Sequence, residues 1–306
     1  MKSVVINEYG SNEVVQIIET PVPVIQTDEV LIRVEAAGVN PIDWKIRDGA
    51  GKRIGLELPI ALGGEIVGTI EAVGSSVRKF KSGDVVYGMV KTGGFSEYAA
   101  AKAEDLSLKP EALTVNEAAA ISLGGLTAWQ GLFDQAGLGR GQRLLITGAS
   151  GAVGSLAVQF AKERGAYVIA VASSRNQTFV KSLGADEVLN YEIEKFEEIV
   201  RDVDVVFDTV GGKAFENSFA TVRRGGVVVT SVSMVKGDEF EKLGVHAKRV
   251  FCKANGTQLD EISGLVKAGK VKARVAQVLP LEEIKTALQL SESGHANGKM
   301  VLTFGT

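Results

Sequence analysis

Residues 144–154 read Leu-Leu-Ile-Thr-Gly-Ala-Ser-Gly-Ala-Val-Gly, an apolar run that leads directly into glycines. A helical pattern over Ser155–Arg164 and a second apolar run over Tyr167–Ala172 follow it. This order is typical of a dinucleotide-binding turn, in which Gly151 lets a diphosphate approach the main chain and the first amides of the helix face its charge. Gly154 allows close packing of that helix on its strand. The alternative interpretation is an ordinary loop.

The end of the second strand indicates which dinucleotide would bind. Enzymes that use NAD usually place an acidic residue there, which binds the adenosine ribose. This chain reads Ser173-Ser174-Arg175-Asn176, and the next acidic residue is Asp186. A guanidinium and small hydroxyls offer charge-assisted hydrogen bonds to the extra phosphate of NADP, so the sequence favours NADPH. Alternatively, Arg175 is a solvated residue in the first turn of a helix.

The composition predicts a soluble, cytoplasmic protein with two hydrophobic cores. The chain has 306 residues, 45% of them hydrophobic, and a net charge of −3, which provides no basic field for nucleic acid. Its one cysteine, Cys252, excludes an internal disulfide or a thiolate zinc cluster and suits a reducing cytosol. Residues 1–6 start a strand rather than a signal peptide, and no uncharged apolar run approaches the ~20 residues that cross a bilayer, so we expect no membrane partner.

Runs rich in β-branched residues and bounded by turn residues predict a mostly β first domain. The expected strands are Glu29–Val39, Ile66–Val73, Asp84–Val90 and Phe95–Ala101.

From Asn116 the pattern changes to helices, at 117–121 and Leu126–Gln135, and then to alternating strands and helices. Such alternation is the pattern of a parallel sheet. The expected strands are Arg143–Ile146, Tyr167–Val171, Glu187–Asn190, Val203–Phe207 and Val227–Thr230. Apolar helices at Leu259–Ala268 and Leu281–Leu290 precede a closing strand, Lys299–Phe304, that we expect to return to the first domain.

The predicted class is therefore α/β, with an internal nucleotide-binding domain built on a doubly wound parallel sheet. We place this nucleotide domain at residues 119–265, and the β-rich domain at residues 1–118 and 266–306.

Six ordered motifs make the chain similar to a known family: Ala37–Asp43, Gly63–Gly68, Gly83–Gly88, Gly125–Trp129, Asp208–Gly212 and Gly298-Lys299. With them the chain resembles the medium-chain dehydrogenase/reductase superfamily, in its zinc-free quinone oxidoreductase (zeta-crystallin-like) branch. The resemblance covers nearly the whole length. It implies a GroES-like β-rich catalytic domain, a Rossmann domain that binds NADPH, a cleft between the two domains and, commonly, a homodimer.

Zinc-dependent relatives carry a cysteine at the position of Asn40 and a histidine at that of Gly64, and they add a separate four-cysteine lobe. The two histidines of this chain, His246 and His295, lie far from these positions in the sequence, so we expect no metal. What remains is hydride transfer to an already polarised acceptor, a quinone or a carbon–carbon double bond conjugated to a carbonyl.

Such chemistry needs hydrogen-bond donors for the oxygen that gains negative charge. The family places Asn40 beside the nicotinamide, which makes it the first candidate both as donor and as cofactor contact. An Asn before Pro41 is also an ordinary turn residue. Lys45 stands where some quinone reductases carry a pocket tyrosine, and Lys52 lies near a second such position. Lys45 could donate to the oxyanion, or it could be a surface lysine.

The family's cofactor contacts carry over by position. The resemblance places Thr127 near the nicotinamide, Ser173, Ser174 and Arg175 at the phosphate, and Tyr191 near the adenosine. The turn supplies Ala149, Ser150, Gly151, Ala152, Val153 and Gly154, and Val210 and Gly211 follow the fourth strand of the domain. For five further candidates a core or surface role is equally open: Ser231, Phe251, Lys253, Asn297 and Lys299.

The predicted function is an NADPH-dependent, metal-free reductase of quinones or of α,β-unsaturated carbonyls (enals and enones). One alternative is an NADPH-binding redox sensor or structural protein with weak turnover, which the missing pocket tyrosines keep open. Another is an enoyl-thioester reductase, although no basic cluster for a phosphopantetheine or coenzyme A is evident in the sequence.

Overall fold

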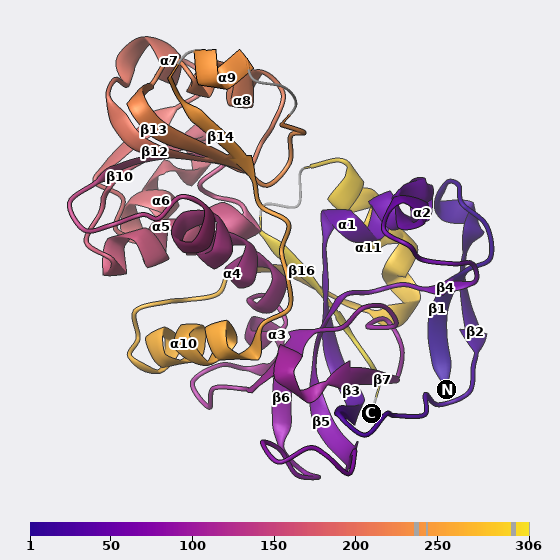
Figure 1. The fold of residues 1–306 in the computed structure, drawn as a ribbon. Coiled ribbons are helices and arrows are strands. Elements are labelled where there is room, and N and C mark those ends of the chain that lie inside the picture. Colours follow the sequence, from indigo (N-terminus) through magenta and orange to yellow (C-terminus); the bar gives the residue numbers. More distant parts are fainter. Residues whose placement is uncertain (236–238, 243, 295–297, 306) are drawn as a thin grey trace. The chain divides into compact units, whose positions relative to one another are not determined.

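The computed structural model describes residues 1–235, 239–242, 244–294 and 298–305. The chain forms two compact units (Figure 1). Unit 1 comprises Met1–Leu123, Ala254–Gly269 and Ala273–Thr306, and unit 2 comprises Gly124–Lys253 and Lys270–Lys272. In the described part of the chain, no helix is long and apolar enough to cross a membrane.

Unit 1 contains two sheets built largely from antiparallel strands. The smaller sheet has the order β2-β1-β4, with β1 at Lys2–Ile6, β2 at Val15–Glu19 and β4 at Ile60–Ala61. The larger has the order β15-β16-β3-β5-β6-β8, and β7 also pairs with β3. Its strands are β3 (Glu29–Val39), β5 (Glu65–Val73), β6 (Val85–Met89), β7 (Tyr98–Lys102), β8 (Leu106–Leu108), β15 (Val275–Pro280) and β16 (Lys299–Thr303).

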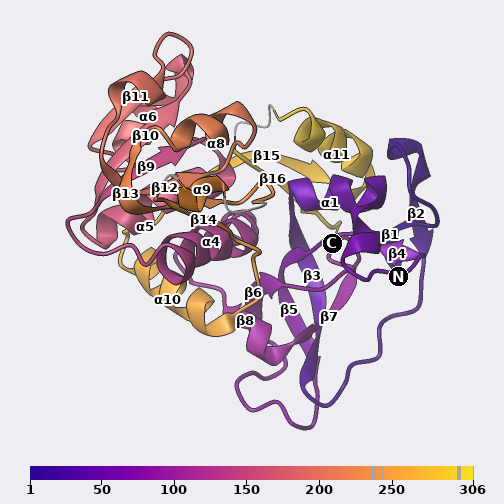
Figure 2. The same cartoon turned by 45° about the horizontal axis from the view of Figure 1, so that its top comes forward.

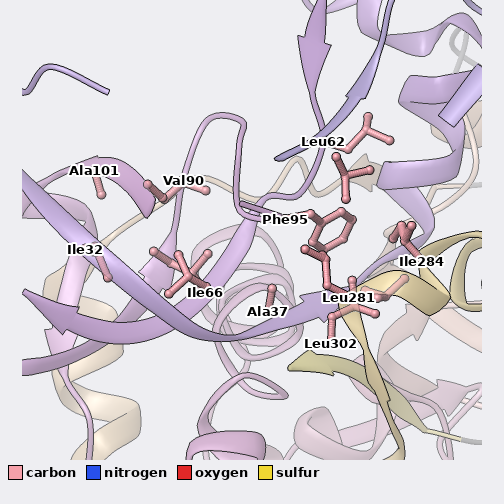
Figure 3. Packing of buried hydrophobic residues seen from close by; sticks show 14 of the residues in the cluster. Ile32, Ala37, Leu62, Ile66, Val90, Phe95, Ala101, Leu281, Ile284 and Leu302 are labelled. Atoms are coloured by element: carbon pink, nitrogen blue, oxygen red, sulfur yellow. The ribbon is translucent and has the colours of Figure 1, made fainter. Parts of the chain in front are cut away.

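The closing strand β16 pairs antiparallel with β3, with Met300 opposite Val39. This confirms that the end of the chain returns to the first domain. Alternate residues of β3, such as Val30, Ile32 and Val34, are buried, as the period of two in a strand requires. They belong to a core in which Phe95 is fully buried, and Figure 3 shows its ring among side chains of the loops, sheet and C-terminal helix.

Short helices complete unit 1. The C-terminal helix α11 lies beside β15 and β16 (Figure 2). The helices are α1 (Pro41–Lys45), the π-helical turn η2 (Ile46–Ala50), α2 (Gly51–Arg53), α3 (Val115–Ala118), α10 (Gly256–Lys267) and α11 (Ile284–Glu292), with 3-10 turns η1 (Asn12–Val14), η3 (Ala103–Asp105) and η6 (Leu281–Glu283).

Helix α10 belongs to unit 1, whereas the predicted boundary at 265/266 assigns most of it to the nucleotide domain. The cause is a set of polar contacts that sequence patterns do not reveal. Tyr87 Oη donates to the Leu259 carbonyl at 3.0 Å, and Ser107 Oγ donates to Asp260 Oδ1 at 2.6 Å. Gly256 permits this packing, because a Cβ there would lie 2.4 Å from the Leu106 carbonyl oxygen. The first boundary likewise falls at 123/124 rather than 118/119.

Unit 2 contains a six-stranded sheet in which all neighbouring strands are parallel, with the order β11-β10-β9-β12-β13-β14 (Figures 1 and 2). The strands are β9 (Arg143–Thr147), β10 (Tyr167–Ala172), β11 (Glu187–Asn190), β12 (Val203–Asp208), β13 (Val222–Thr230) and β14 (His246–Arg249). The parallel sheet and the first five strands were expected. Strand β14 was not expected, because this edge strand reads His-Ala-Lys-Arg and has no apolar run.

The middle of the sheet is closed to solvent, since Leu144, Leu145 and Ile146 of β9 are fully buried. Trp129 packs edge-on against Phe160 with ring centroids 5.3 Å apart, which makes it a core residue. The helices are α4 (Ser122–Trp129), the π-helical turn η4 (Gln130–Gln135), α5 (Ala152–Glu163), the 3-10 turn η5 (Ser174–Asn176), α6 (Gln177–Ser182), α7 (Phe196–Ile199), α8 (Lys213–Ser218) and α9 (Glu239–Lys242).

Candidate cofactor and substrate sites

The glycine-rich turn between β9 and α5 has the geometry that a bound diphosphate requires. Gly151 is the N-cap of α5, and no side chain caps this end of the helix. Its uncapped amides and the positive end of the helix dipole therefore suit an anion. Gly148 has φ +67°, and a Cβ at Gly154 would lie 2.2 Å from the Gly148 carbonyl oxygen. Both glycines are thus required by the fold of the turn itself.

The carboxyl edge of the sheet is organised by Asp208, a fully buried carboxylate at the end of β12. It accepts hydrogen bonds from the hydroxyls of Thr147 and Thr230, each at 2.7 Å, and so joins the ends of three neighbouring strands. It also accepts from the amides of Val210 and Gly211, at 3.1 and 3.0 Å. Asp208 was expected only as part of a motif, without a role of its own. Its position at a strand end, three residues before the first of two glycines, was the available signal.

The expected adenosine residues come together because β10 and β11 are paired, with Ala172 opposite Asn190. Ser173 is buried and its hydroxyl accepts from Asn176 Nδ2 at 3.0 Å, whereas Ser174 and Arg175 are exposed. Tyr191, which directly follows β11, is 60% exposed. Arg175 lies in the 3-10 turn η5, directly before α6, and its predicted contact with the phosphate stays a prediction.

A carboxylate that the sequence analysis missed also lies here. The Ser174 amide donates to Glu192 Oε2 at 3.0 Å, so Glu192 reaches across from the loop after β11. Sequence distance concealed it, because Glu192 follows the third strand rather than the second.

The remaining unit 2 candidates follow the other strand ends. The Ser231 amide donates to the Asp208 carbonyl at 2.9 Å. Phe251 is 64% exposed, with the Arg249 guanidinium 4.5 Å from its ring centroid. The main chain of Lys253 is held by Gln130 through hydrogen bonds of 2.8 and 2.9 Å. Thr127 is buried on α4.

Two unit 1 candidates, Asn40 and Lys299, form a buried polar cluster with Glu65 at the end of β3. Asn40 Nδ2 donates to the Gly38 carbonyl and to Glu65 Oε2, both at 3.0 Å. Lys299 Nζ donates to Asn40 Oδ1 and to Glu65 Oε2, and Glu65 Oε1 accepts from the Leu123 amide at 2.9 Å. Both hydrogens of the Asn40 amide and its oxygen are therefore engaged inside the protein. Its expected role as an oxyanion donor stays a prediction that requires one of these bonds to break.

This cluster, consisting of Asn40, Glu65 and Lys299, is almost completely buried: these side chains are 3%, 0% and 3% exposed. Gly38 makes room for it, since a Cβ there would lie 2.5 Å from Glu65 Oε2 and 2.7 Å from Lys299 Cε. Lys299 was predicted as a cofactor contact, and in the structure its ammonium is an internal ion-pair partner.

Asp43 lies next to this cluster. Its Oδ2 accepts a hydrogen bond from the main-chain amide of Asn40 at 2.7 Å. Burial of the carboxyl group raises its pKa to about 7, although the Asn40 hydrogen bond and the charge of Lys299 act in the opposite direction. The hydrogen bond from the Asn40 main chain to Asp43 fixes the start of α1.

Two further unit 1 candidates, Lys45 and Asn297, lie outside this cluster or outside the described residues. Lys45 Nζ lies 5.4 Å from the centroid of the neighbouring Trp44 ring. Asn297 lies outside the described residues, so its predicted cofactor contact stays a prediction.

The two positions that carry zinc ligands in the zinc-dependent relatives do not offer a zinc site here. Gly64 has no side chain, and the oxygen of Asn40 already accepts from the Lys299 ammonium. A divalent cation at that oxygen would face a buried positive charge, so this donor set does not fit zinc. Over the described residues, no group of three or more His, Cys, Asp and Glu side chains is arranged to hold a metal ion.

Comparisons with known proteins match both units. Residues 26–111 match the alcohol dehydrogenase GroES-like domain, and residues 183–302 match the zinc-binding dehydrogenase domain. The mitochondrial NAD(P)H oxidoreductase RTN4IP1 of Mus musculus is 34% identical over 351 residues, which cover 99% of this chain and 89% of the relative. The chloroplastic NADPH-dependent alkenal/one oxidoreductase of Arabidopsis thaliana is 33% identical over 316 residues, with 99% and 79% covered.

Among solved structures, the quinone oxidoreductase of Escherichia coli in complex with NADPH superimposes with a TM-score of 0.89 at 28% identity, covering 99% of this chain and all of that one. The chain belongs to the medium-chain dehydrogenase/reductase superfamily, in its quinone oxidoreductase branch. This confirms the family and the fold class expected from the six motifs.

Proposed function

We propose that this chain is an NADPH-dependent oxidoreductase that reduces quinones or the carbon–carbon double bond of α,β-unsaturated carbonyls, without a metal ion. The observation that carries the proposal is the uncapped α5 behind Gly151, with Arg175 at the end of the neighbouring strand. The names of the relatives supply the substrate classes, alkenals or alkenones in one case and quinones in another.

The residues of unit 2 fit NADPH by their chemistry. The amides at the start of α5 would hold the diphosphate, and the Arg175 guanidinium with the Ser173–Ser174 segment would hold the 2′-phosphate. Tyr191 would cover the adenosine, and Val210 and Gly211, whose amides Asp208 fixes, would border the nicotinamide half. When bound, the cofactor would supply the hydride.

The unit 1 cluster supports the proposal of metal-free chemistry, because its donor set does not fit zinc. A quinone or an enone is polarised before it binds, so it needs hydrogen-bond donors rather than a Lewis acid to accept a hydride. We propose Asn40 and Lys45 as the residues of unit 1 that would donate hydrogen bonds to the reacting carbonyl. Zinc analysis of the purified protein tests the metal: we expect no stoichiometric zinc and full activity in chelator. One tightly held zinc ion per chain would refute this part of the proposal.

The activity is tested by NADPH oxidation against a panel of quinones, enals, enones and simple alcohols. With NADPH deuterated at C4 and an enone, we expect the label at the β-carbon of the product. We expect no reaction with simple alcohols. Tight NADPH binding without turnover of any acceptor would favour the alternative of a redox sensor or structural protein.

We also propose that the protein is a cytoplasmic homodimer. Within the described residues β14 is the last strand of the unit 2 sheet, and an edge strand of this kind can pair with a second copy. Light scattering coupled to gel filtration should give twice the chain mass of 32.3 kDa. The relatives include mitochondrial and chloroplastic proteins, so a tagged chain followed by microscopy in its native cell tests the compartment.

A further inference from the structure

The loop after β11 places an acidic side chain on the loop after β10, where the 2′-phosphate of NADPH would bind. The Ser174 amide donates to Glu192 Oε2 at 3.0 Å, and the Glu192 amide in turn donates to Asn190 Oδ1 at 3.1 Å. The parallel pairing of Ala172 with Asn190 brings the two loops together. Glu192 is exposed, so its carboxylate is reachable by a ligand.

The Ser174 amide is a donor that an anion beside Arg175 needs. Ser174 opens the 3-10 turn η5, and in the sequence it stands between the buried Ser173 and the exposed Arg175. No ion pair between Arg175 and Glu192 is formed within the described residues, so the carboxylate is held by the amide and not by the guanidinium. Glu192 thus occupies one donor of the proposed phosphate site while leaving Arg175 unneutralised.

We propose that Glu192 is a cofactor-specificity residue that lowers the ratio of NADPH affinity to NADH affinity in this chain. The inference rests on the proposed function. A 2′-phosphate must displace the carboxylate from the Ser174 amide and then lie beside it, and the two negative charges repel each other. The 2′-hydroxyl of NADH, in contrast, can donate a hydrogen bond to the same carboxylate, as the acidic residue of NAD-dependent enzymes accepts one.

Arg175 and Glu192 therefore act in opposite directions at one site. Arg175 attracts the phosphate, and Glu192 reduces that gain while supporting the unphosphorylated ribose. The chain should accept both dinucleotides, with NADPH preferred by less than Arg175 alone would give. Because both charges are exposed, the contribution of Glu192 should decrease as salt is added.

The test is Glu192→Gln, which keeps an oxygen for the Ser174 amide and removes the charge. Calorimetric titrations with NADPH, NADH, 2′,5′-ADP and 5′-AMP give the affinity ratios without any turnover. We expect the NADPH to NADH affinity ratio to rise by about tenfold at low salt, with the larger part of the change in NADPH, and the same trend for the two fragments.

The matched control is Glu198→Gln, which also removes one negative charge. Glu198 is an exposed side chain further along the same segment and pairs with Lys195 at 2.8 Å. It should leave both ratios unchanged. Dinucleotide binding with equal ratios in the wild type, Glu192→Gln and Glu198→Gln would refute the role of Glu192 alone. Absence of binding of all four ligands to the wild type would refute the proposed function, and the inference with it.

Discussion

Replacement of Lys299 by Met should destabilise unit 1 strongly while leaving the parallel sheet of unit 2 intact. The ammonium is one of three donors to Glu65, together with the Asn40 amide and the Leu123 main chain. Both charged side chains are almost fully buried, at 3% and 0% exposure. Loss of one partner of a buried ion pair leaves an uncompensated charge and costs about 3–5 kcal/mol. For a domain of this size that corresponds to a decrease in Tm of roughly 10 °C.

The assay must resolve the two units, because a chain with two units need not unfold in one step. Hydrogen exchange followed by mass spectrometry provides this: in Lys299→Met, peptides of β3, β5 and β16 should lose protection, while those of β9 and β12 should keep it.

The control is the double variant Lys299→Met with Glu65→Gln. Removal of both charges leaves no buried ion, so most of the lost stability should return. A loss below about 1 kcal/mol in the single variant, or no recovery in the double variant, would refute the argument that this pair is an interdependent buried unit.

Three further predictions concern single side chains. Arg175→Glu should weaken NADPH binding by about 2 kcal/mol or more and leave NADH nearly unaffected, as measured by titration; equal losses for both cofactors would contradict the assignment. Burial raises the pKa of Asp43 from its usual value of 3.8 to about 7. Between these two pH values the folded state keeps a proton that the unfolded state has released. Stability from this group is therefore present at low pH and decreases as pH rises through that window, by about 1.4 kcal/mol per pH unit, and Asp43→Asn should abolish this slope in urea titrations at several pH values. Asn40→Ala should lower kcat by about tenfold to a thousandfold in steady-state assays if its side-chain amide supports the developing oxyanion. A loss of stability in unit 1 with unchanged kcat would instead indicate a positioning role.

Much of the fold could be predicted because its signals are local. The runs at Glu29–Val39 and Glu187–Asn190 matched the observed strands, since each is apolar or β-branched and bounded by turn residues. Strand β14 carried no such signal, because an edge strand with Lys248 and Arg249 buries little apolar surface. Helix α10 was assigned to the nucleotide domain because its packing on unit 1 depends on hydrogen bonds from Tyr87 and Ser107, more than 150 residues away in sequence.

The candidate sites differ in how far the sequence could predict them, and the reason is the range of the interactions involved. The turn at Gly151 is encoded within one segment, so its geometry follows from residue types and spacing. Whether a side chain is available to a ligand depends instead on distant partners, and two residues show this. The Asn40 amide is engaged by Glu65 and Lys299, which are 25 and 259 positions away. Glu192 reaches Ser174 over 18 positions, because two parallel strands end side by side. Residue type predicts what a group can donate or accept, whereas only the folded chain determines what is already bound to it. Both proposals therefore concern the same question, whether a cofactor or substrate can displace an internal partner, and the titrations with Glu192→Gln answer it directly for the nucleotide site.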